Sequence, residues 1–345
     1  MNTTMHTPAL PDEVDADLAA ALQRFAQLDA ATQTPGMDYV QRRRWLSTAQ
    51  AQLIRQPLAG VNQQDHFLAL PGREVVVRSY QTAGQSAERA PLIWLHGGGW
   101  MVGDLNTHDD LCERLALFTQ RTVLSVHYRR TPENPFPAPL EDVMAVLDWV
   151  RAMQGLLPFG HTEALLGGDS AGGHLALAAA VRQLQQRPAD AGCAHIAGLL
   201  LLYPPMLPNQ DTPSMRAFAQ GFGLTPAAMK QYWDALGPDF AAIADPAACA
   251  ALAAWRTPSL CTAQLPALPP TVVMTASHDI LRDEAEAFAK EAQSLGAPVT
   301  LLRAPGMVHS FARMLACSVA AVAQVRHACE MLQAQLHPTP TGPAG

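Results

Sequence analysis

The sequence has little of what marks a metal site, a nucleic-acid surface or a membrane span. The formal net charge of −7 comes from 30 acidic and 23 basic residues without a basic cluster, so no nucleic-acid partner is expected. No stretch approaches the roughly 18 apolar residues of a spanning helix, so no membrane partner is expected either. No phosphate loop, nucleotide fingerprint or metal-ligand cluster is present, and the sequence therefore implies no cofactor.

The spacing of the cysteines indicates neither a metal site nor disulfide bonds. The six cysteines lie far apart and form no Cys-x-x-Cys pair, which argues against a zinc site and against a disulfide framework. We expect them to be reduced and mostly buried as small apolar residues. They are Cys112, Cys193, Cys249, Cys261, Cys317 and Cys329.

Length and composition favour one domain with a large core. The chain has 345 residues, of which 49% are hydrophobic, and α/β folds of this size often form a single domain. Residues 1–7 carry no basic region followed by an apolar run, so the sequence predicts a soluble, cytoplasmic protein that is not exported. The oligomeric state stays open, with a homodimer as one alternative.

Strands and helices alternate along most of the chain. The expected strands cover 74–80, 91–96, 122–127, 164–167, 196–203, 270–276 and 298–303. The expected helices between and after them cover 107–120, 139–153, 172–187, 283–295 and 310–335. This order predicts an α/β fold with a mostly parallel sheet that helices cover on both faces.

The segment Gly168-Asp169-Ser170-Ala171-Gly172 lies between an expected strand and an expected helix. This context is typical of a nucleophile elbow, in which a sharp turn exposes the serine hydroxyl and the glycines let strand and helix approach closely. The N–H group of Ala171 would then lie at a helix N-terminus, which favours an anion. The turn therefore predicts Ser170 as a nucleophile and Ala171 as an oxyanion donor.

A second glycine motif supports the elbow, which alone is weak evidence. His96-Gly97-Gly98-Gly99-Trp100 follows the apolar run 91–95 and so lies at the end of a buried strand. Consecutive glycines allow backbone N–H groups to face a substrate oxygen without a side chain in the way. We expect Gly98 and Gly99 to complete an oxyanion hole with Ala171.

Together these motifs resemble the hormone-sensitive lipase family (bacterial family IV) of carboxylesterases in the α/β-hydrolase superfamily. The resemblance extends over nearly the whole chain through further segments in the same order: Tyr128–Asp142, Leu224–Trp233, His278–Glu284 and Pro305–Phe311. It implies an α/β-hydrolase fold with a helical cap. The implied parts are N-terminal cap helices and linker over 1–62, a catalytic core over 63–204 and 263–337, a second part of the cap over 205–262 and a disordered tail over 338–345.

Four positions depart from the family pattern. His127 stands where the family usually has Asp, Ile280 where it has Pro, Ser310 where it has Gly and Ala304 where it has Tyr. None of these positions carries the proton transfer, so we expect changes in local packing and unchanged chemistry.

A serine nucleophile needs a base, and the base needs an orienting acceptor. The order Ser, acid, His of α/β-hydrolases points to His309, which follows a strand, rather than to His327 within a helix or His337 in the tail. Asp279 follows a strand directly and is favoured as the acid. Asp283 is the alternative, although an acidic residue in a first helical turn more often stabilises the helix dipole.

The resulting hypothesis is a serine carboxylesterase that acts through an acyl-enzyme on small, uncharged esters of short to medium acyl chains. An amidase or lactonase with the same triad and a non-catalytic, ligand-binding relative are the alternatives. The residues expected to form pocket walls are Trp100, Met206, Leu207, Phe222 and Trp233.

Overall fold

The computed structural model describes residues 13–32, 38–51, 58–86, 88–186, 192–208, 211–237 and 258–337. Residues 238–257 of the expected second part of the cap and the expected tail over 338–345 therefore lie outside the described residues, as does Cys249.

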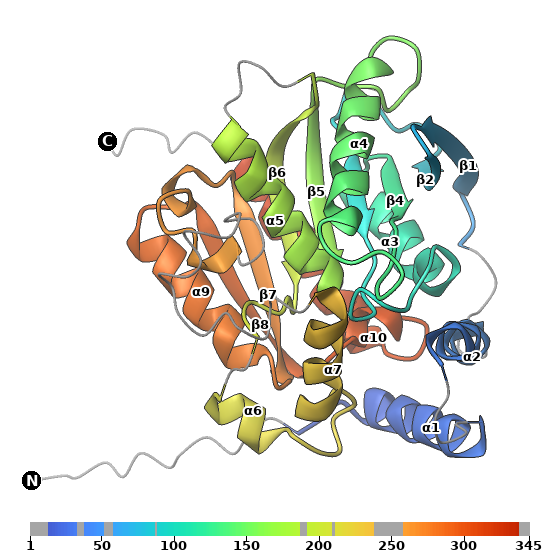
Figure 1. The fold of residues 1–345 in the computed structure, drawn as a ribbon, viewed down its shortest axis with the longest axis vertical. Helices are drawn as coiled ribbons and strands as arrows, with labels where there is room; N and C mark the ends of the chain where they lie inside the picture. The colour runs from blue at the N-terminus through green and yellow to red at the C-terminus, as the bar shows by residue number, and fades with distance from the viewer. Residues whose placement is uncertain are drawn as a thin grey trace, which may run out of the picture.

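A single eight-stranded sheet forms the centre of the described molecule (Figure 1), with the strand order β1-β2-β4-β3-β5-β6-β7-β8. Neighbouring strands are parallel from β4 to β8, and only the pairs β1–β2 and β2–β4 are antiparallel. This arrangement confirms the predicted mostly parallel sheet. The strands are β1 Val61–Leu70, β2 Arg73–Thr82, β3 Leu92–Leu95, β4 Val123–His127, β5 Glu163–Asp169, β6 His195–Leu202, β7 Thr271–His278 and β8 Val299–Val308.

Strand β1 is the one element of the sheet that the sequence did not predict, since the first expected strand covers 74–80. Most of its side chains are exposed or half-buried, and Phe67 has 65% of its surface exposed. Residues 62–65 are all exposed, and only Leu68 is buried, so the first half of the strand lacks the apolar alternation by which strands are recognised. Its position is set by ten antiparallel residue pairs with β2, from Val61–Thr82 to Leu70–Arg73.

Helices cover both faces of the sheet, and on each face a hydrophobic core lies between the sheet and its helices. Helices α4, α5 and α9 pack on one face, and α3 and α10 pack on the other. Strand β3 shows the division: Ile93 and Leu95 belong to the first core, and Leu92 and Trp94 belong to the second. The helices are α1 Ala16–Thr32, α2 Tyr39–Ala51, α3 Asp109–Thr119, α4 Ala138–Ala152, α5 Ala171–Gln186, α6 Pro213–Ala217, α7 Pro226–Leu236, α9 Arg282–Ser294 and α10 Val319–Leu336, with short 3-10 helices at η1 Asn106–His108, η5 Pro258–Leu260, η6 Leu265–Ala267 and η7 Phe311–Arg313.

The expected single helix over 310–335 is wrong in its first part. The chain forms η7, and α10 begins only at Val319. Ser318 starts this helix, because its hydroxyl accepts a hydrogen bond of 3.1 Å from the N–H of Ala321. The break leaves residues 309–318 as a loop beside the sheet.

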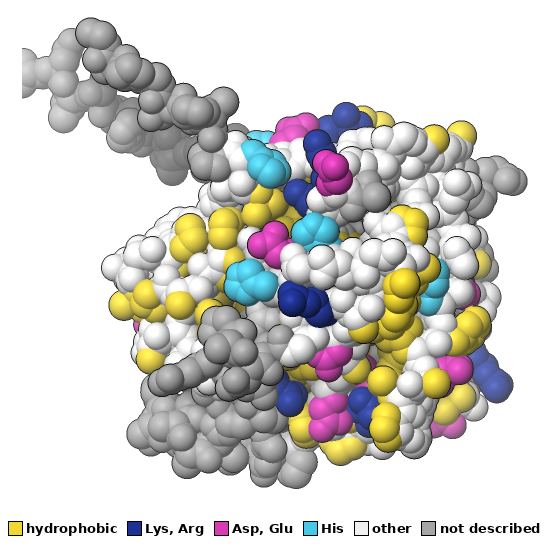
Figure 2. Space-filling model, turned by 90° about the horizontal axis from the view of Figure 1, so that it is seen from above, with side chains coloured by type: hydrophobic (Ala, Val, Ile, Leu, Met, Phe, Trp, Pro, Cys, Tyr) yellow, Lys and Arg dark blue, Asp and Glu magenta, His cyan; other side chains and the backbone are white. Residues whose placement is uncertain are grey.

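Helices α1, α2, α6 and α7 gather at one end of the molecule (Figure 1), where they are the described parts of the segments expected to form a cap. No helix within the described ranges is long and apolar enough to cross a lipid bilayer. On the face seen in Figure 2, acidic and basic side chains are interspersed, and neither sign forms a large patch there.

Candidate active site

Ser170 lies in a tight turn between β5 and α5, and its backbone has a positive φ of 51°. A β-carbon on Gly172 would overlap the carbonyl oxygen of Leu95, and one on Gly168 would overlap the backbone of Gly172. The N–H of Ser170 donates to the carbonyl oxygen of Leu202 over 2.8 Å. Glycine is therefore required on both sides of Ser170 for strand and helix to meet.

His309 and Asp279 reach this serine from the ends of two other strands. His309 directly follows β8, and its Nε2 lies 2.9 Å from Oγ of Ser170. Asp279 directly follows β7, and its Oδ2 lies 2.7 Å from Nδ1 of His309. Only 1% of the surface of Asp279 is exposed, and 7% of that of each of the other two residues.

The contacts of His309 define where its proton lies. A carboxylate only accepts, so Nδ1–H of His309 donates to Asp279, and Nε2 on the other side of the ring faces the hydroxyl of Ser170, where it can accept the proton. The N–H of Leu281 donates to the other oxygen of Asp279 over 3.0 Å, which fixes the carboxylate. Tyr203 also packs edge-on against the imidazole with ring centroids 5.0 Å apart.

Asp283, the alternative acid, has different partners. It accepts hydrogen bonds from Nε of Arg282 at 2.9 Å and from the N–H of Ser214 at 2.7 Å. Burial opposes ionisation of Asp283, but these hydrogen bonds outweigh it and hold the pKa of its carboxyl below the usual value. Asp283 thus joins α9 to α6, and Asp279 is the carboxylate at the imidazole.

The glycine loop after β3 lies beside the elbow. Gly98 and Gly99 have positive φ values of 121° and 58°, and the carbonyl of Gly98 accepts from the N–H groups of Met101 and Val102. A β-carbon on Gly99 would overlap the ring of Tyr232. Within the part of the chain that the structure describes, the N–H groups of Gly98, Gly99 and Ala171 have no protein acceptor, and all three residues line the same cavity.

Asp169, the residue before the nucleophile, connects the two loops. Its buried Oδ1 accepts from the N–H of Gly97 over 3.0 Å, and its Oδ2 lies 3.3 Å from Nε2 of His108. Burial disfavours the charged carboxylate, but His108, Arg313 and the N–H of Gly97 together keep the pKa of Asp169 below its usual value. The negative charge therefore holds the glycine loop against the elbow.

His96 supports the same loop from behind. It is fully buried, stacks on Tyr128 with centroids 4.3 Å apart, and donates from Nδ1 to the carbonyl of Gly97 over 3.0 Å. Burial lowers the pKa of His96 well below the usual value, so the ring is neutral. The role of His96 is therefore to support the glycine loop.

Glu284 is a buried carboxyl near the triad that the sequence did not single out. Its Oε1 accepts from the N–H of Met206 over 2.7 Å. Burial, together with the negative charge of Asp279, raises the pKa of Glu284 to about 8, although backbone hydrogen bonds act in the opposite direction. At neutral pH this group is a carboxylic acid.

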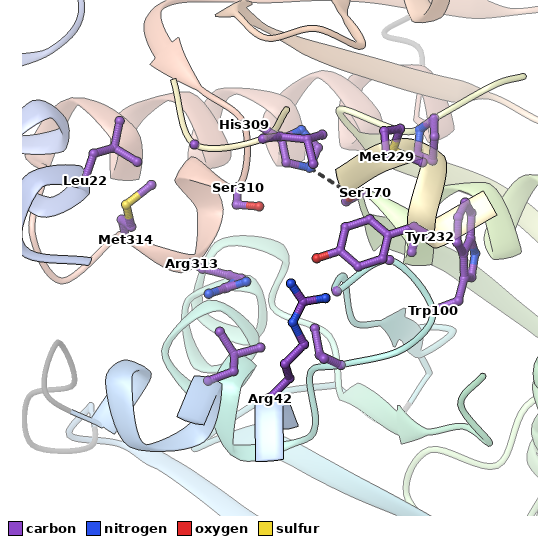
Figure 3. A pocket seen from close by; sticks show the side chains of 18 of the residues that line it. Leu22, Arg42, Trp100, Ser170, Met229, Tyr232, His309, Ser310, Arg313 and Met314 are labelled. Atoms are coloured by element: carbon purple, nitrogen blue, oxygen red, sulfur yellow. Dashed lines mark hydrogen bonds between the residues drawn. The ribbon is translucent and has the colours of Figure 1, made fainter. Parts of the chain in front are cut away.

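A cavity of about 510 Å³ opens over Ser170 and His309 (Figure 3). Its walls come from α1, α2, the loop before α7, α7 itself and η7. The lining residues are Leu22, Arg42, Trp45, Leu46, Gly98, Gly99, Trp100, Val102, Ser170, Ala171, Pro205, Gly221, Gly223, Leu224, Met229, Tyr232, His309, Ser310, Arg313 and Met314.

Of the five expected wall residues, Trp100 lies on this cavity. Met206 and Trp233 are buried in the core, and Trp233 packs against Trp100 and His174. Phe222 stacks on His278 with centroids 5.5 Å apart, and Leu207 packs against the first core. The expectation is therefore wrong for these four residues, which do not line the cavity.

Ser310 has a left-handed backbone with φ of 64°, at the position where the family resemblance implies glycine. This conformation costs a residue with a β-carbon on the order of 1 kcal/mol. Serine in place of the family's glycine thus still forms the left-handed turn after His309, at this small cost in stability.

Sequence comparison places the chain among known hydrolases. The family model for the alpha/beta hydrolase fold matches residues 92–313. The carboxylic ester hydrolase LipN of Mycobacterium tuberculosis is 32% identical over 286 residues, covering 81% of this chain and 72% of LipN. The carboxylesterase NlhH of the same organism is 31% identical over 260 residues, covering 71% of this chain and 74% of NlhH.

The fold has a near match among solved structures. A thermostable esterase from Pseudomonas putida ECU1011 superposes with a TM-score of 0.82 at 27% identity, covering 97% of this chain and all of the esterase.

Proposed function

Because the chain belongs to the alpha/beta hydrolase fold family and is a carboxylic ester hydrolase, we propose that it cleaves esters through an acyl-enzyme on Ser170. His309 serves as general base and Asp279 as its orienting partner. The observation that carries the proposal is the continuous chain of contacts from Oγ of Ser170 through both imidazole nitrogens to a buried carboxylate.

The first half of the reaction forms the acyl-enzyme. Oγ of Ser170 attacks the ester carbonyl carbon while Nε2 of His309 takes the hydroxyl proton, and Asp279 stabilises the resulting imidazolium. Collapse of the tetrahedral intermediate expels the alcohol, to which His309 returns the proton. In the second half, His309 takes a proton from water, the hydroxide attacks the acyl carbonyl, and the acid leaves as Ser170 regains its proton.

The oxyanion of each tetrahedral intermediate would be held by the N–H groups of Gly98, Gly99 and Ala171. Support comes from their unused donors on the cavity and from the start of α5 at Ala171, where the helix dipole favours negative charge. Asp169 anchors the loop that carries the first two donors.

We also propose a preference for short to medium acyl chains. The cavity of about 510 Å³ lies within the range of small-molecule sites, and cap residues bound it on several sides. On a series of 4-nitrophenyl esters, we expect kcat/KM to fall from short to long acyl chains. Highest activity on long, emulsified chains would refute this preference.

Labelling with an organophosphonate followed by mass mapping tests the nucleophile without knowledge of the substrate. We expect one adduct, on the peptide that contains Ser170, and no adduct in Ser170→Ala. The variant should lose about 10⁶-fold in kcat on a short ester. An adduct at another residue, or turnover retained in the variant, would contradict the proposal.

Matched ester and amide substrates separate the proposed esterase from an amidase with the same triad. The esterase should cleave the ester far faster, because an amine is a much poorer leaving group than an alcohol and its nitrogen must be protonated before the C–N bond breaks. Release of a single equivalent of nitrophenol without turnover would instead indicate a binding protein.

A further inference from the structure

The cavity over Ser170 contains two arginines and no acidic side chain. Arg42 enters from α2 and Arg313 from η7, and none of the described residues that line the cavity is Asp or Glu. Figure 3 shows Arg42 entering the cavity with its guanidinium end foremost. A protein of net charge −7 thus presents a positively charged wall at its candidate active site.

Neither arginine is neutralised by an ion pair with a residue that the structure describes. Nη1 of Arg42 donates to the amide oxygen of Gln231 over 3.0 Å, and Nη2 of Arg313 donates to the amide oxygen of Gln50 over 3.3 Å. Among the described residues neither forms a salt bridge, and the buried Nε of Arg313 has no acceptor at all. Both groups therefore keep donors for a ligand.

The next residue on α2 shows the contrast. Arg43 pairs with Glu133 at 2.6 Å and also donates to the carbonyl oxygens of Met101 and Thr131. Arg43 thus fixes α2 to the loops around the active site with its charge balanced. Arg42, on the same fixed helix, is left with its charge facing the cavity.

The two arginines are not electrostatically equal. Burial raises the pKa of Asp169, and nearby positive charges lower it. His108 contributes most to this lowering, and Arg313 contributes a smaller part. Part of the positive charge of Arg313 is therefore offset beneath the elbow. Arg42 has no such buried partner in the described ranges, so it should have the larger effect on a ligand.

We propose that this enzyme takes esters that carry a second, anionic group of the carboxylate type, which Arg42 and Arg313 bind. The inference rests on the proposed esterase function and names its substrate class. A guanidinium group matches a carboxylate with two parallel hydrogen bonds, and such charge-assisted bonds are stronger in a partly enclosed site than in water. Small uncharged esters would remain substrates, with lower kcat/KM.

Matched esters in which a carboxylate replaces a methyl group test the proposal. For the acyl side, monoethyl adipate is compared with ethyl hexanoate. For the alcohol side, 4-acetoxybutanoate is compared with butyl acetate, and the released alcohol or acetate is quantified. We expect the charged ester of at least one pair to have about tenfold higher kcat/KM, and the pair concerned identifies the side that binds the arginines.

Variants then assign the preference to the cavity. Arg42→Gln should lower the charged-to-neutral ratio about tenfold, Arg313→Gln should lower it less, and Arg42→Lys should keep part of it. Arg44→Gln is the matched control, because it removes an exposed charge of the same helix outside the cavity lining, and it should leave the ratio unchanged. A purely structural role of Arg42 would instead slow both esters of a pair equally.

The outcomes separate this inference from the proposed function. Turnover of neutral esters without any preference for the charged ones, or a preference that survives Arg42→Gln, overturns the anion site alone. Absence of ester turnover together with absence of a phosphonate adduct at Ser170 overturns both. A fall in the ratio as salt is raised from 0.05 to 0.5 M is expected, because screening weakens a partly exposed charge pair.

Discussion

The floor and the wall of the cavity are built in different ways. The floor consists of loops that directly follow β3, β5, β7 and β8, and its glycines Gly98 and Gly172 lie so close to the backbone of other residues that a β-carbon would not fit. The wall consists of residues from α1, α2, the loop before α7, α7 and η7, which come from distant parts of the sequence. The floor therefore tolerates few changes, whereas the wall can change its chemistry one side chain at a time.

Among the substitutions that test this difference between floor and wall, the largest loss of kcat is expected at Asp279 in the floor. Asp279→Asn should lower kcat on a short ester by about 10⁴-fold, since an amide neither holds the required tautomer of His309 nor stabilises its charge. Asp283→Asn, four residues on, should change kcat by less than about threefold, because Asp283 bonds Arg282 and Ser214. A greater loss in Asp283→Asn than in Asp279→Asn would reverse the assignment of the acid.

The next effect is expected where the two loops of the floor meet. A β-carbon in Gly97→Ala would overlap the carboxylate of Asp169 and lie 2.9 Å from its carbonyl oxygen. Displacing the loop should cost about 10²- to 10³-fold in kcat, the size of losing one oxyanion donor. Gly192→Ala, with no atom within 4 Å of the new β-carbon, is the control in the same assay. Equal activities of the two variants would refute the rigid floor.

A wall substitution should act on preference more than on turnover. Leu224→Ala enlarges the cavity, so kcat/KM on hexanoyl relative to acetyl 4-nitrophenyl esters should rise several-fold. The change in kcat on the acetyl ester should stay below about tenfold. If kcat instead collapsed as in the floor variants, the division between floor and wall would fail.

The smallest effect concerns stability at Glu284. Its pKa of about 8 in the folded protein lies above the ordinary value of 4.5. Between these pH values the folded protein keeps a proton that the unfolded chain releases, so the free energy of unfolding decreases as pH rises. The slope from this group is at most about 1.4 kcal/mol per pH unit.

Urea unfolding at pH 5, 6.5 and 8 measures that slope. Glu284→Gln cannot titrate and should flatten the decline, whereas Glu291→Gln, exposed on the same helix, should not. Parallel curves for Glu284→Gln and the parent would show that the buried carboxyl does not control this part of the pH dependence.

The sequence predicted most of the sheet because its inner strands are continuous apolar runs between turn signals. It missed β1, in which residues 62–65 are exposed on both sides and only Leu68 is buried. It also extended α10 back to residue 310, because neither the left-handed Ser310 nor the capping role of Ser318 interrupts the apolar pattern. Boundaries set by single capping residues are hard to recognise in such a pattern.

Floor and wall also differ in how far sequence reasoning reached. Ser170, His309 and the glycines occur in short motifs whose spacing follows from the turn that they form. For the wall, an apolar residue near β6 or α7 fits the core as well as the cavity, so Met206 and Trp233 could not be told apart from lining residues. Arg42 stands in a run of three arginines, and only the packing of α2 shows that it faces inward.

The bond from Gly97 to Asp169 has a consequence for how such an enzyme diversifies. Because the neighbour of the attacking serine carries the loop that would receive the negative oxygen, a small shift of one displaces the other in the same direction. The reaction centre can thus be inherited as one preassembled piece. New substrates are then acquired by exchanging helices above it, without retuning the distances on which bond cleavage depends.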